Sequence, residues 1–450
     1  MSSRFASPHR PTTIVCMALT LEQYGKSIVA AGLLTGDELR TWWTSLTPER
    51  KPRDVESFAA RLVEDGKLTH YQSQVLLQGK GSALAFGNYV LTQQIGVGAS
   101  GYVFKAKHKH SGRLVAIKIL SNAFAQDEKA LKRFQREIEA AGRLVHPNIV
   151  QSFDAGQLNG QHYMVMEFVD GSDLTDIVKN NGVYNVEGAI KAIRQAAAGL
   201  QYAHEQGVIH RDIKPRNLLQ DNNGGVRLLD MGLVRLSDGG DSLTATQQVM
   251  GTVDYMSPEQ ALDPKKADVR SDIYSLGCTL WFLLTGKKLY DAKGVVDRIM
   301  MHRSSPIPLL MKEQTVPKEL QVVFEKMVAK KPDERYQSMK EVIAALDAVL
   351  NPAGSAAAAA NSNIEAIEES GEELAEVEMV SEQSMMNIPK LNLTTAAIAP
   401  AADSRGDVLL DFAKAPKPKP AAAKAANSKS TASVGGSFFS RLLGKFKKNK

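Results

Sequence analysis

The chain has 450 residues, an apolar fraction of 43% and a formal net charge of +6, which allows two or three domains with sizeable hydrophobic cores. Its two cysteines, Cys16 and Cys278, exclude a disulfide framework and a cysteine-based metal cluster, which suits a reducing cytosol. No apolar run reaches the roughly 20 residues of a membrane-spanning helix, so we expect a cytoplasmic chain without a transmembrane helix.

The N-terminal part is expected to contain a disordered tail, residues 1–18, followed by a small helical module, residues 19–82. Apolar residues in the module recur at the spacing of helix faces: Leu21, Tyr24, Ile28 and Val29, then Phe58, Leu62 and Val63. Asp37 and Asp54 are predicted helix N-caps. We interpret the module as an interaction or scaffolding domain, and we expect a short linker over residues 79–87.

The pattern changes to strands near residue 88 and to helices beyond Gly171. Strands are predicted over residues 89–91, 102–106, 114–119, 149–154 and 163–168, with a charged helix over 127–144. The remainder is mostly helical to about Leu350. A strand-rich half followed by a helix-rich half indicates an α+β protein with two lobes.

The C-terminal part changes composition again after Pro352. An alanine run, a glutamate-rich stretch and a Lys-Ala-Pro tract predict a disordered linker over residues 351–436. Residues 437–450 combine aromatic and aliphatic residues on one helical face with lysines around it. Two interpretations stay open: contact with an anionic membrane at its inner face, or a basic tail or docking peptide.

A glycine-rich pattern, G-x-G-x-x-G, occupies residues 96–101 between two predicted strands. Glycines allow a backbone to approach phosphates closely, although a simple hairpin with a glycine bend explains the pattern equally well. A dinucleotide-binding fold would require a helix directly after the last glycine. Because Tyr102 and Val103 continue as a strand, that interpretation is disfavoured.

Lys118 ends an apolar strand, where burying its charge is costly unless the ammonium is paired. Phosphate oxygens and a carboxylate would provide that pairing. On the following helix Glu137 is the preferred partner and Glu139 the alternative. The alternative interpretation is that Lys118 is an exposed lysine on an edge strand and has no functional role.

The sequence His-Arg-Asp-Ile-Lys-Pro-Arg-Asn at residues 210–217, followed by Asp-Met-Gly at 230–232, is the most informative feature. Phosphoryl transfer needs a group that orients a hydroxyl and groups that hold magnesium. Asp212 is the predicted base and Lys214 the predicted phosphate contact. Asn217 and Asp230 are the predicted ligands of Mg²⁺, which prefers oxygen. His210 is expected to be structural.

Taken together, residues 88–350 resemble a eukaryotic-type (Hanks-type) bacterial serine/threonine protein kinase domain, because every main motif of that family occurs in order. The resemblance implies a bilobal α+β fold with a β-rich N-lobe and a helical C-lobe. It implies that Met166 is the gatekeeper, that Glu259 pairs with Arg335, and that Asp272 anchors the 210–217 loop. Lys118 and Glu137 join Asp212 and Lys214 as catalytic residues.

The resemblance also implies ATP and Mg²⁺ as cofactors. The residues expected to bind the nucleotide are Ile95, Gly96, Val97, Gly98, Ala99, Ser100, Gly101, Tyr102, Val103, Ala116, Lys118, Glu167 and Val169. Met231 stands where the family has phenylalanine. Methionine is apolar and adaptable enough to fill that position, so we expect an active enzyme.

The helical module before the kinase resembles the arrangement in planctomycete kinases. Thr244 and Thr246 are expected autophosphorylation sites, with Arg211 receiving the phosphate charge and self-association as a route to it. The expected function is transfer of the ATP γ-phosphate to serine or threonine of protein substrates in bacterial signalling; no nucleic-acid partner is expected. A pseudokinase scaffold and a small-molecule phosphotransferase are the alternatives.

Overall fold

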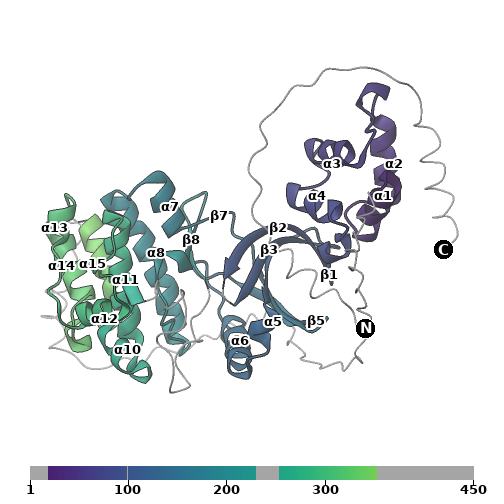
Figure 1. Cartoon of the computed structure of the whole chain (residues 1–450). Coiled ribbons are helices and arrows are strands. Elements are labelled where there is room, and N and C mark those ends of the chain that lie inside the picture. The colour runs from purple at the N-terminus through teal and green to yellow at the C-terminus, as the bar shows by residue number, and fades with distance from the viewer. Residues whose placement is uncertain (1–18, 99, 230–252, 352–450) are drawn as a thin grey trace, which may run out of the picture. The chain divides into compact units, whose positions relative to one another are not determined.

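The computed structural model describes residues 19–98, 100–229 and 253–351 (Figure 1). Within these, the first unit comprises residues up to 121 together with 156–163. The second unit comprises 122–155 and the described residues from 164 onward. Among the described residues, none of the helices is both long enough and apolar enough to cross a bilayer.

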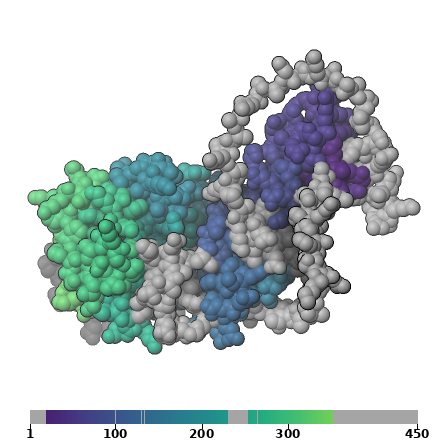
Figure 2. Space-filling view, viewed as in Figure 1, coloured from purple at the N-terminus to yellow at the C-terminus, as the bar shows by residue number. Residues whose placement is uncertain are grey.

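The first unit opens with the helical module, whose helices form one packed body, purple in Figure 2. Its elements are α1 (Leu21–Ala30), α2 (Gly36–Ser45), η1 (Pro48–Arg50), α3 (Val55–Glu64), α4 (His70–Leu77) and η2 (Gly81–Leu84). Phe58 lies at its centre, with ring centroids 5.5 Å from Tyr24, 5.7 Å from Trp42 and 5.5 Å from Trp43. Aromatic side chains packed in this way contribute much of the stability of a small hydrophobic core.

Every α-helix of the module begins with a capping box, in which the N-cap and N3 residues bond each other's backbone. The predicted N-cap Asp54 is confirmed for α3. The prediction for Asp37 is wrong, because Thr35 caps α2 by pairing with Glu38, and Asp37 lies within the first turn. A threonine followed by glutamate three residues later satisfies two backbone amides, which a lone aspartate in the first turn does not.

Four strands follow the module, and each pairs antiparallel with the next. They are β1 (Ala85–Phe86), β2 (Tyr89–Gly98), β3 (Gly101–His108) and β4 (Leu114–Leu120). The stretch expected as a linker, residues 79–87, instead folds into η2 and β1. Since Phe86 is buried and pairs with Tyr89, the module continues into the sheet without a free connection.

The second unit is mostly helical and begins with α5 (Asn122–Ala125) and α6 (Glu128–Ala141). Strands β5 (Ser152–Leu158) and β6 (Gln161–Glu167) contribute residues to both units. A small antiparallel sheet follows, in the order β7 (Gly171–Asp173), β8 (Leu218–Asp221) and β9 (Val226–Leu228). Its other elements are α7 (Leu174–Asn181), α8 (Val186–Glu205), η3 (Pro215–Asn217), η4 (Val253–Tyr255), α10 (Pro258–Leu262), η5 (Pro264–Lys266), α11 (Val269–Thr285), α12 (Val295–Ser304), α13 (Leu310–Glu313), α14 (Lys318–Met327), η6 (Pro332–Glu334) and α15 (Met339–Leu350).

Helix α11 forms the centre of the second unit, because nearly all of its side chains are buried, including the predicted core residue Cys278. A helix buried on every side belongs to the interior of a domain. At Gly277 an added Cβ would lie 2.6 Å from Val328, so glycine allows close packing there. The predicted order, strands first and then helices, is confirmed. The predicted strand at 149–154 begins later, at Ser152.

Candidate active site

The 210–217 loop is anchored by the carboxylate of Asp272, in the first turn of α11. This carboxylate is fully buried and accepts three hydrogen bonds: from Nε2 of His204 at 2.8 Å, from the amide of His210 at 2.9 Å and from the amide of Arg211 at 2.7 Å. Hydrogen bonds from amides to a buried carboxylate are among the stronger ones in proteins. The anchoring role expected of Asp272 is therefore confirmed. The contact of His204 with Asp272 was not predicted, because no sequence motif marks this histidine of α8.

Arg211 adopts a left-handed backbone conformation, with φ of 63°. Such a conformation is costly for a residue with a Cβ and needs support from its surroundings. Besides the bond to Asp272, the Arg211 carbonyl accepts a hydrogen bond of 2.7 Å from Nε2 of Gln260, on α10. This role of Gln260 was not predicted, because a hydrogen bond between residues 49 apart in the chain leaves no local sequence pattern.

His210 is fully buried and connects the loop to the end of β9. Its Nε2 lies 3.0 Å from the carbonyl oxygen of Leu229, and its Nδ1 lies 3.3 Å from the amide of Asp212. Because an amide can only donate, Nδ1 accepts and Nε2 carries the proton. These contacts support the structural role predicted for His210. Leu229 also donates its amide to the carbonyl of Asn217 at 2.8 Å, so the residue preceding Asp230 is tied to the loop.

Asp212, Lys214 and Asn217 form one hydrogen-bonded cluster. Nζ of Lys214 lies 2.7 Å from Oδ2 of Asp212. Nδ2 of Asn217 donates to the carbonyl of Asp212 at 2.8 Å and to its Oδ2 at 3.1 Å. Because both bonds use the amide nitrogen, they fix the orientation of the carboxamide and leave Oδ1 as the oxygen available to a hard cation. Both Asp212 and Lys214 are mostly buried, with side-chain exposures of 16% and 17%.

The glycine-rich pattern folds as the β2–β3 hairpin of the first unit, in which Gly98 pairs with Gly101. Gly101 has φ of 152°, and a Cβ there would lie 2.0 Å from the carbonyl oxygen of Ile119. Only glycine fits this approach of β3 to β4. Lys118, on β4, pairs with Val103 of β3, and its side chain is buried.

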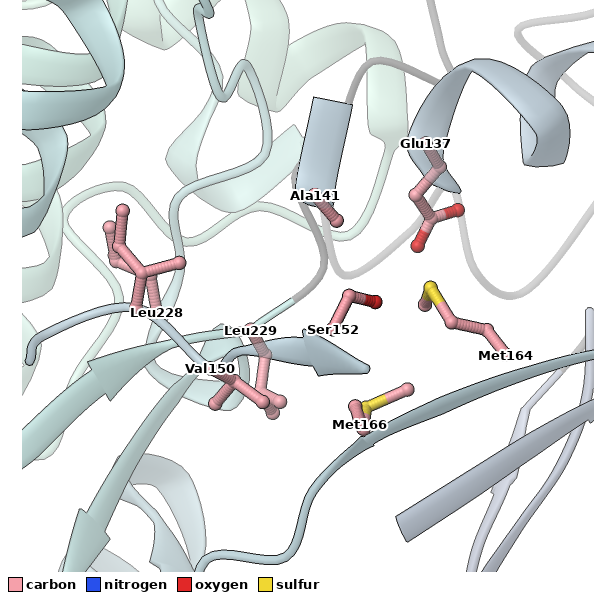
Figure 3. A pocket seen from close by; sticks show the side chains of 9 residues that line it. Glu137, Ala141, Val150, Ser152, Met164, Met166, Leu228 and Leu229 are labelled. Carbon is pink, nitrogen blue, oxygen red and sulfur yellow. The ribbon is translucent and has the colours of Figure 1, made fainter. Parts of the chain in front are cut away.

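A small cavity of about 20 Å³ lies in the second unit (Figure 3). It is lined by Glu137, Ala141, Ile149, Val150, Ser152, Met164, Met166, Leu228 and Leu229. The carboxylate of Glu137 points toward the thioether of Met164. This volume holds about one water molecule. Glu137 is buried whereas Glu139 is exposed. Of the two glutamates considered in the sequence, Glu137 is therefore the one whose carboxylate lies away from solvent.

The region around Met166 is held by backbone contacts. The amide of Glu167 donates to the carbonyl of Gln151 at 2.8 Å. The carboxylate of Glu167 lies 3.7 Å from Nε of Arg227. Upstream, the amide of Val150 donates to the carbonyl of Leu228 at 3.0 Å, and the amide of Leu228 donates to the carbonyl of Asn148 at 2.9 Å. These bonds pair the start of the predicted 149–154 strand with β9, which explains why β5 begins only at Ser152.

Residues 89–345, more than half of the chain, match the model of the protein kinase domain family. The chain belongs to the protein kinase family. Serine/threonine-protein kinase PknB of Mycolicibacterium smegmatis is 39% identical over 264 residues, covering 57% of this chain and 42% of the relative. PknB of Mycobacterium tuberculosis is 38% identical over 269 residues, covering 58% and 43%. The chain thus spans less than half the length of these curated relatives.

The crystal structure of the Mycobacterium tuberculosis PknI kinase domain is similar at 30% identity, covering 59% of this chain and 97% of that one with a TM-score of 0.46. The family match confirms the predicted Hanks-type bacterial kinase and its α+β fold class. The resemblance to planctomycete kinases stays a prediction, since the two PknB relatives are mycobacterial.

The kinase domain also contains a largely buried ion pair between Glu259 of α10 and Arg335. Two parallel hydrogen bonds of 2.8 Å join the guanidinium to both carboxylate oxygens, and Oγ of Ser271 donates to Oε1 at 2.6 Å. The expected Glu259–Arg335 pair is therefore confirmed. Burial raises the pKa of the Glu259 carboxyl, but the bonds and charge of Arg335 outweigh it, so the net pKa lies below the ordinary value.

Several predicted site residues lie outside the described residues. They are Ala99, Asp230, Met231, Thr244 and Thr246. Of the predicted residues that are described, the structure brings Asp212, Lys214 and Asn217 into contact with one another.

We predict that Glu259→Gln lowers the free energy of unfolding by roughly 3–5 kcal/mol at pH 7, because the buried Arg335 charge loses its anionic partner. A carboxyl with a lowered native pKa contributes stability above its ordinary pKa, 4.5, and loses it as pH falls through the native value. The deficit of the variant should therefore shrink below about pH 4.5. Urea unfolding followed by tryptophan fluorescence measures this difference in the free energy of unfolding.

The control is Glu334→Gln, which removes an exposed ion pair with Lys331. Equal stability of the two variants would contradict the stabilising role assigned to the Glu259–Arg335 pair.

Proposed function

We propose that this chain is a serine/threonine protein kinase that transfers the γ-phosphoryl group of ATP to hydroxyls of protein substrates. The observation that carries the proposal is the Asp212–Lys214–Asn217 cluster, held in place by His210 and by the buried carboxylate of Asp272. Phosphoryl transfer depends mainly on positioning and on charge stabilisation, and this cluster offers both. The names of the relatives support serine/threonine specificity.

In the proposed mechanism, Asp212 orients the acceptor hydroxyl and accepts its proton, while the ammonium of Lys214 lies beside the same carboxylate. The lysine would then face the phosphoryl group in transfer. Asn217 fits a magnesium ligand because its carboxamide is oriented by two bonds from Nδ2, and Asp230 would be the second ligand. When bound, Mg²⁺ neutralises charge on the phosphates.

Nucleotide binding is proposed for the hairpin, for Lys118 with Glu137, and for the backbone between Glu167 and Val169. Both Lys118 and Glu137 are buried, and burying such charges is costly unless each is paired. The close approach at Gly101 is consistent with a hairpin whose backbone approaches phosphates. We further propose the helical module, residues 19–82, and the kinase domain, residues 88–350, as the functional divisions of the chain.

Activation by autophosphorylation of Thr244 or Thr246, through self-association, is proposed as the regulation of this site. Among the described residues, the buried Nε of Arg211 has no hydrogen-bond partner. An arginine with an unused donor suits a phosphate that arrives later. Arg211, with its strained backbone, directly precedes Asp212 in the chain. A phosphate bound to the Arg211 side chain would therefore stabilise the loop next to the predicted base.

We predict that Asp212→Asn lowers phosphoryl transfer by about 10²- to 10⁴-fold, the usual contribution of a positioned base, while nucleotide affinity is retained. The purified chain is incubated with labelled ATP and magnesium, with and without a generic protein substrate, beside Asp212→Asn and the exposed control Asp37→Asn. Label on protein should disappear only in the Asp212 variant, and phosphopeptides should map to Thr244 or Thr246. Absence of label with the wild-type chain would overturn the proposed function, and label confined to other sites would overturn the proposed regulation.

Contact with an anionic membrane is proposed for residues 437–450, which lie outside the described residues and combine a hydrophobic face with lysines. The full chain should float with vesicles containing phosphatidylserine, whereas a chain truncated after Gly436 should stay in the soluble fraction. Equal flotation of the two would reject the proposal.

A further inference from the structure

Strand β2 carries a bulge shortly before the glycine hairpin. Leu91 pairs with Ala106 and Gln93 pairs with Lys105, so Thr92 is the extra residue on β2. Its hydroxyl donates to the carbonyl of Lys105 at 3.0 Å. A bulge bends the strand, increases its twist and disrupts the ladder locally. The direction in which β2 continues toward Gly96–Gly101 therefore depends on how this bulge is held.

The start of helix α4 in the helical module holds the bulge. Oγ1 of Thr69 donates to the carbonyl of Thr92 at 2.6 Å, and Nε2 of Gln72 donates to the carbonyl of Leu91 at 3.0 Å. Gln72 and Leu91 are both buried, so loss of the second bond would leave a carbonyl unsatisfied away from water. Such a group costs more than the bond itself contributes.

The same two side chains also form the capping box of α4. Oε1 of Gln72 accepts from the amide of Thr69 at 3.0 Å, and Oγ1 of Thr69 accepts from the amide of Gln72 at 3.1 Å. Each side chain thus accepts a bond from α4 and donates a bond to β2. Because the cap fixes both side chains, the donors are preorganised toward the bulge.

The capping box of α1 provides an internal comparison. It consists of the same residue types, Thr20 and Gln23, with bonds of 2.9 and 3.2 Å between them. Both residues are exposed, whereas Gln72 is buried against the sheet. The difference between the two boxes is therefore the contact with β2 and not the capping chemistry.

A further contact lies between the bulge and the hairpin tip. The ring centroid of Tyr71 lies 6.1 Å from that of Phe104, which is buried and pairs with Gln94 on β2. A second register shift follows at Ile95, and the hairpin closes at the Gly98–Gly101 pair. Helix α4 therefore contacts both strands of the hairpin directly before its glycine-rich tip.

We propose that Thr69 and Gln72 are positioning residues for nucleotide binding, and that the helical module acts by fixing the β2 bulge and hence the glycine hairpin. This inference rests on the proposed function, because the hairpin is taken as the phosphate-binding element. It gives the module a role inside the enzyme in addition to any partner it binds.

The test compares Gln72→Leu and Gln72→Glu with the matched controls Gln23→Leu and Gln23→Glu in the full chain. Glutamate keeps the oxygen that accepts from the N-cap amide but lacks the donor for Leu91, so it separates capping from bulge binding. We expect both Gln72 variants to raise the Kd of Mg·ADP and the KM for ATP roughly tenfold, equivalent to about 1.4 kcal/mol, with kcat little changed. Amide exchange over residues 93–98 should become faster, and the Gln23 variants should match the wild type.

The exposed residue Thr69 provides a second test if burial of a changed Gln72 unfolds the module, which the fluorescence of Trp42 and Trp43 would reveal. Thr69→Ala should weaken Mg·ADP binding and Thr69→Ser should restore it, with Thr20→Ala as control. Wild-type nucleotide affinity in folded Gln72 and Thr69 variants would overturn the inference and leave the kinase function intact. Weakened Mg·ADP binding in these variants, with no phosphoryl transfer by the wild type, would overturn the function and support the inference.

Discussion

The carboxylate of Asp272 accepts hydrogen bonds from His204 and from the amides of His210 and Arg211, and it does so inside the most buried helix of the second unit. An unsatisfied buried carboxylate would be strongly destabilising, so the loop and the helix require each other. The bonds fix the left-handed backbone of Arg211, which precedes the predicted base directly. Gln260 donates to the carbonyl of the same residue, and His210 ties the loop to Leu229.

The part of the site that could be predicted from sequence is the one whose functional residues contact one another within a single short segment. Asp212, Lys214 and Asn217 are close because a single short loop connects them, and the family resemblance added the distant Glu259–Arg335 pair. The contacts of Gln260 and Gln72 could not be predicted, since each joins a side chain to a backbone carbonyl far away in sequence and leaves no periodic pattern. Likewise, residues 79–87 contain three glycines, which favours a linker, yet β1 forms there because β2 offers a free edge.

The helical module and the glycine hairpin show how a capping motif can acquire a second use. In α1 the Thr-Gln box only completes a helix, whereas in α4 the same pair also satisfies two carbonyls that the β2 bulge exposes. A bulge is useful where a strand must change direction near a functional site, but it needs partners for its freed groups. Supplying them from the module couples the module's folding to the geometry of the hairpin.

The carboxylate of Asp272 holds the 210–217 loop in the geometry proposed for phosphoryl transfer, and amide exchange of Asp272→Asn is the sharpest test of that role. Asparagine retains one acceptor oxygen where three donors now bind, so the amides of His210 and Arg211 should lose protection. We predict faster exchange at these two amides, preserved protection in the rest of α11, and a parallel loss of phosphoryl transfer. Unchanged protection at His210 and Arg211 together with full activity would contradict it.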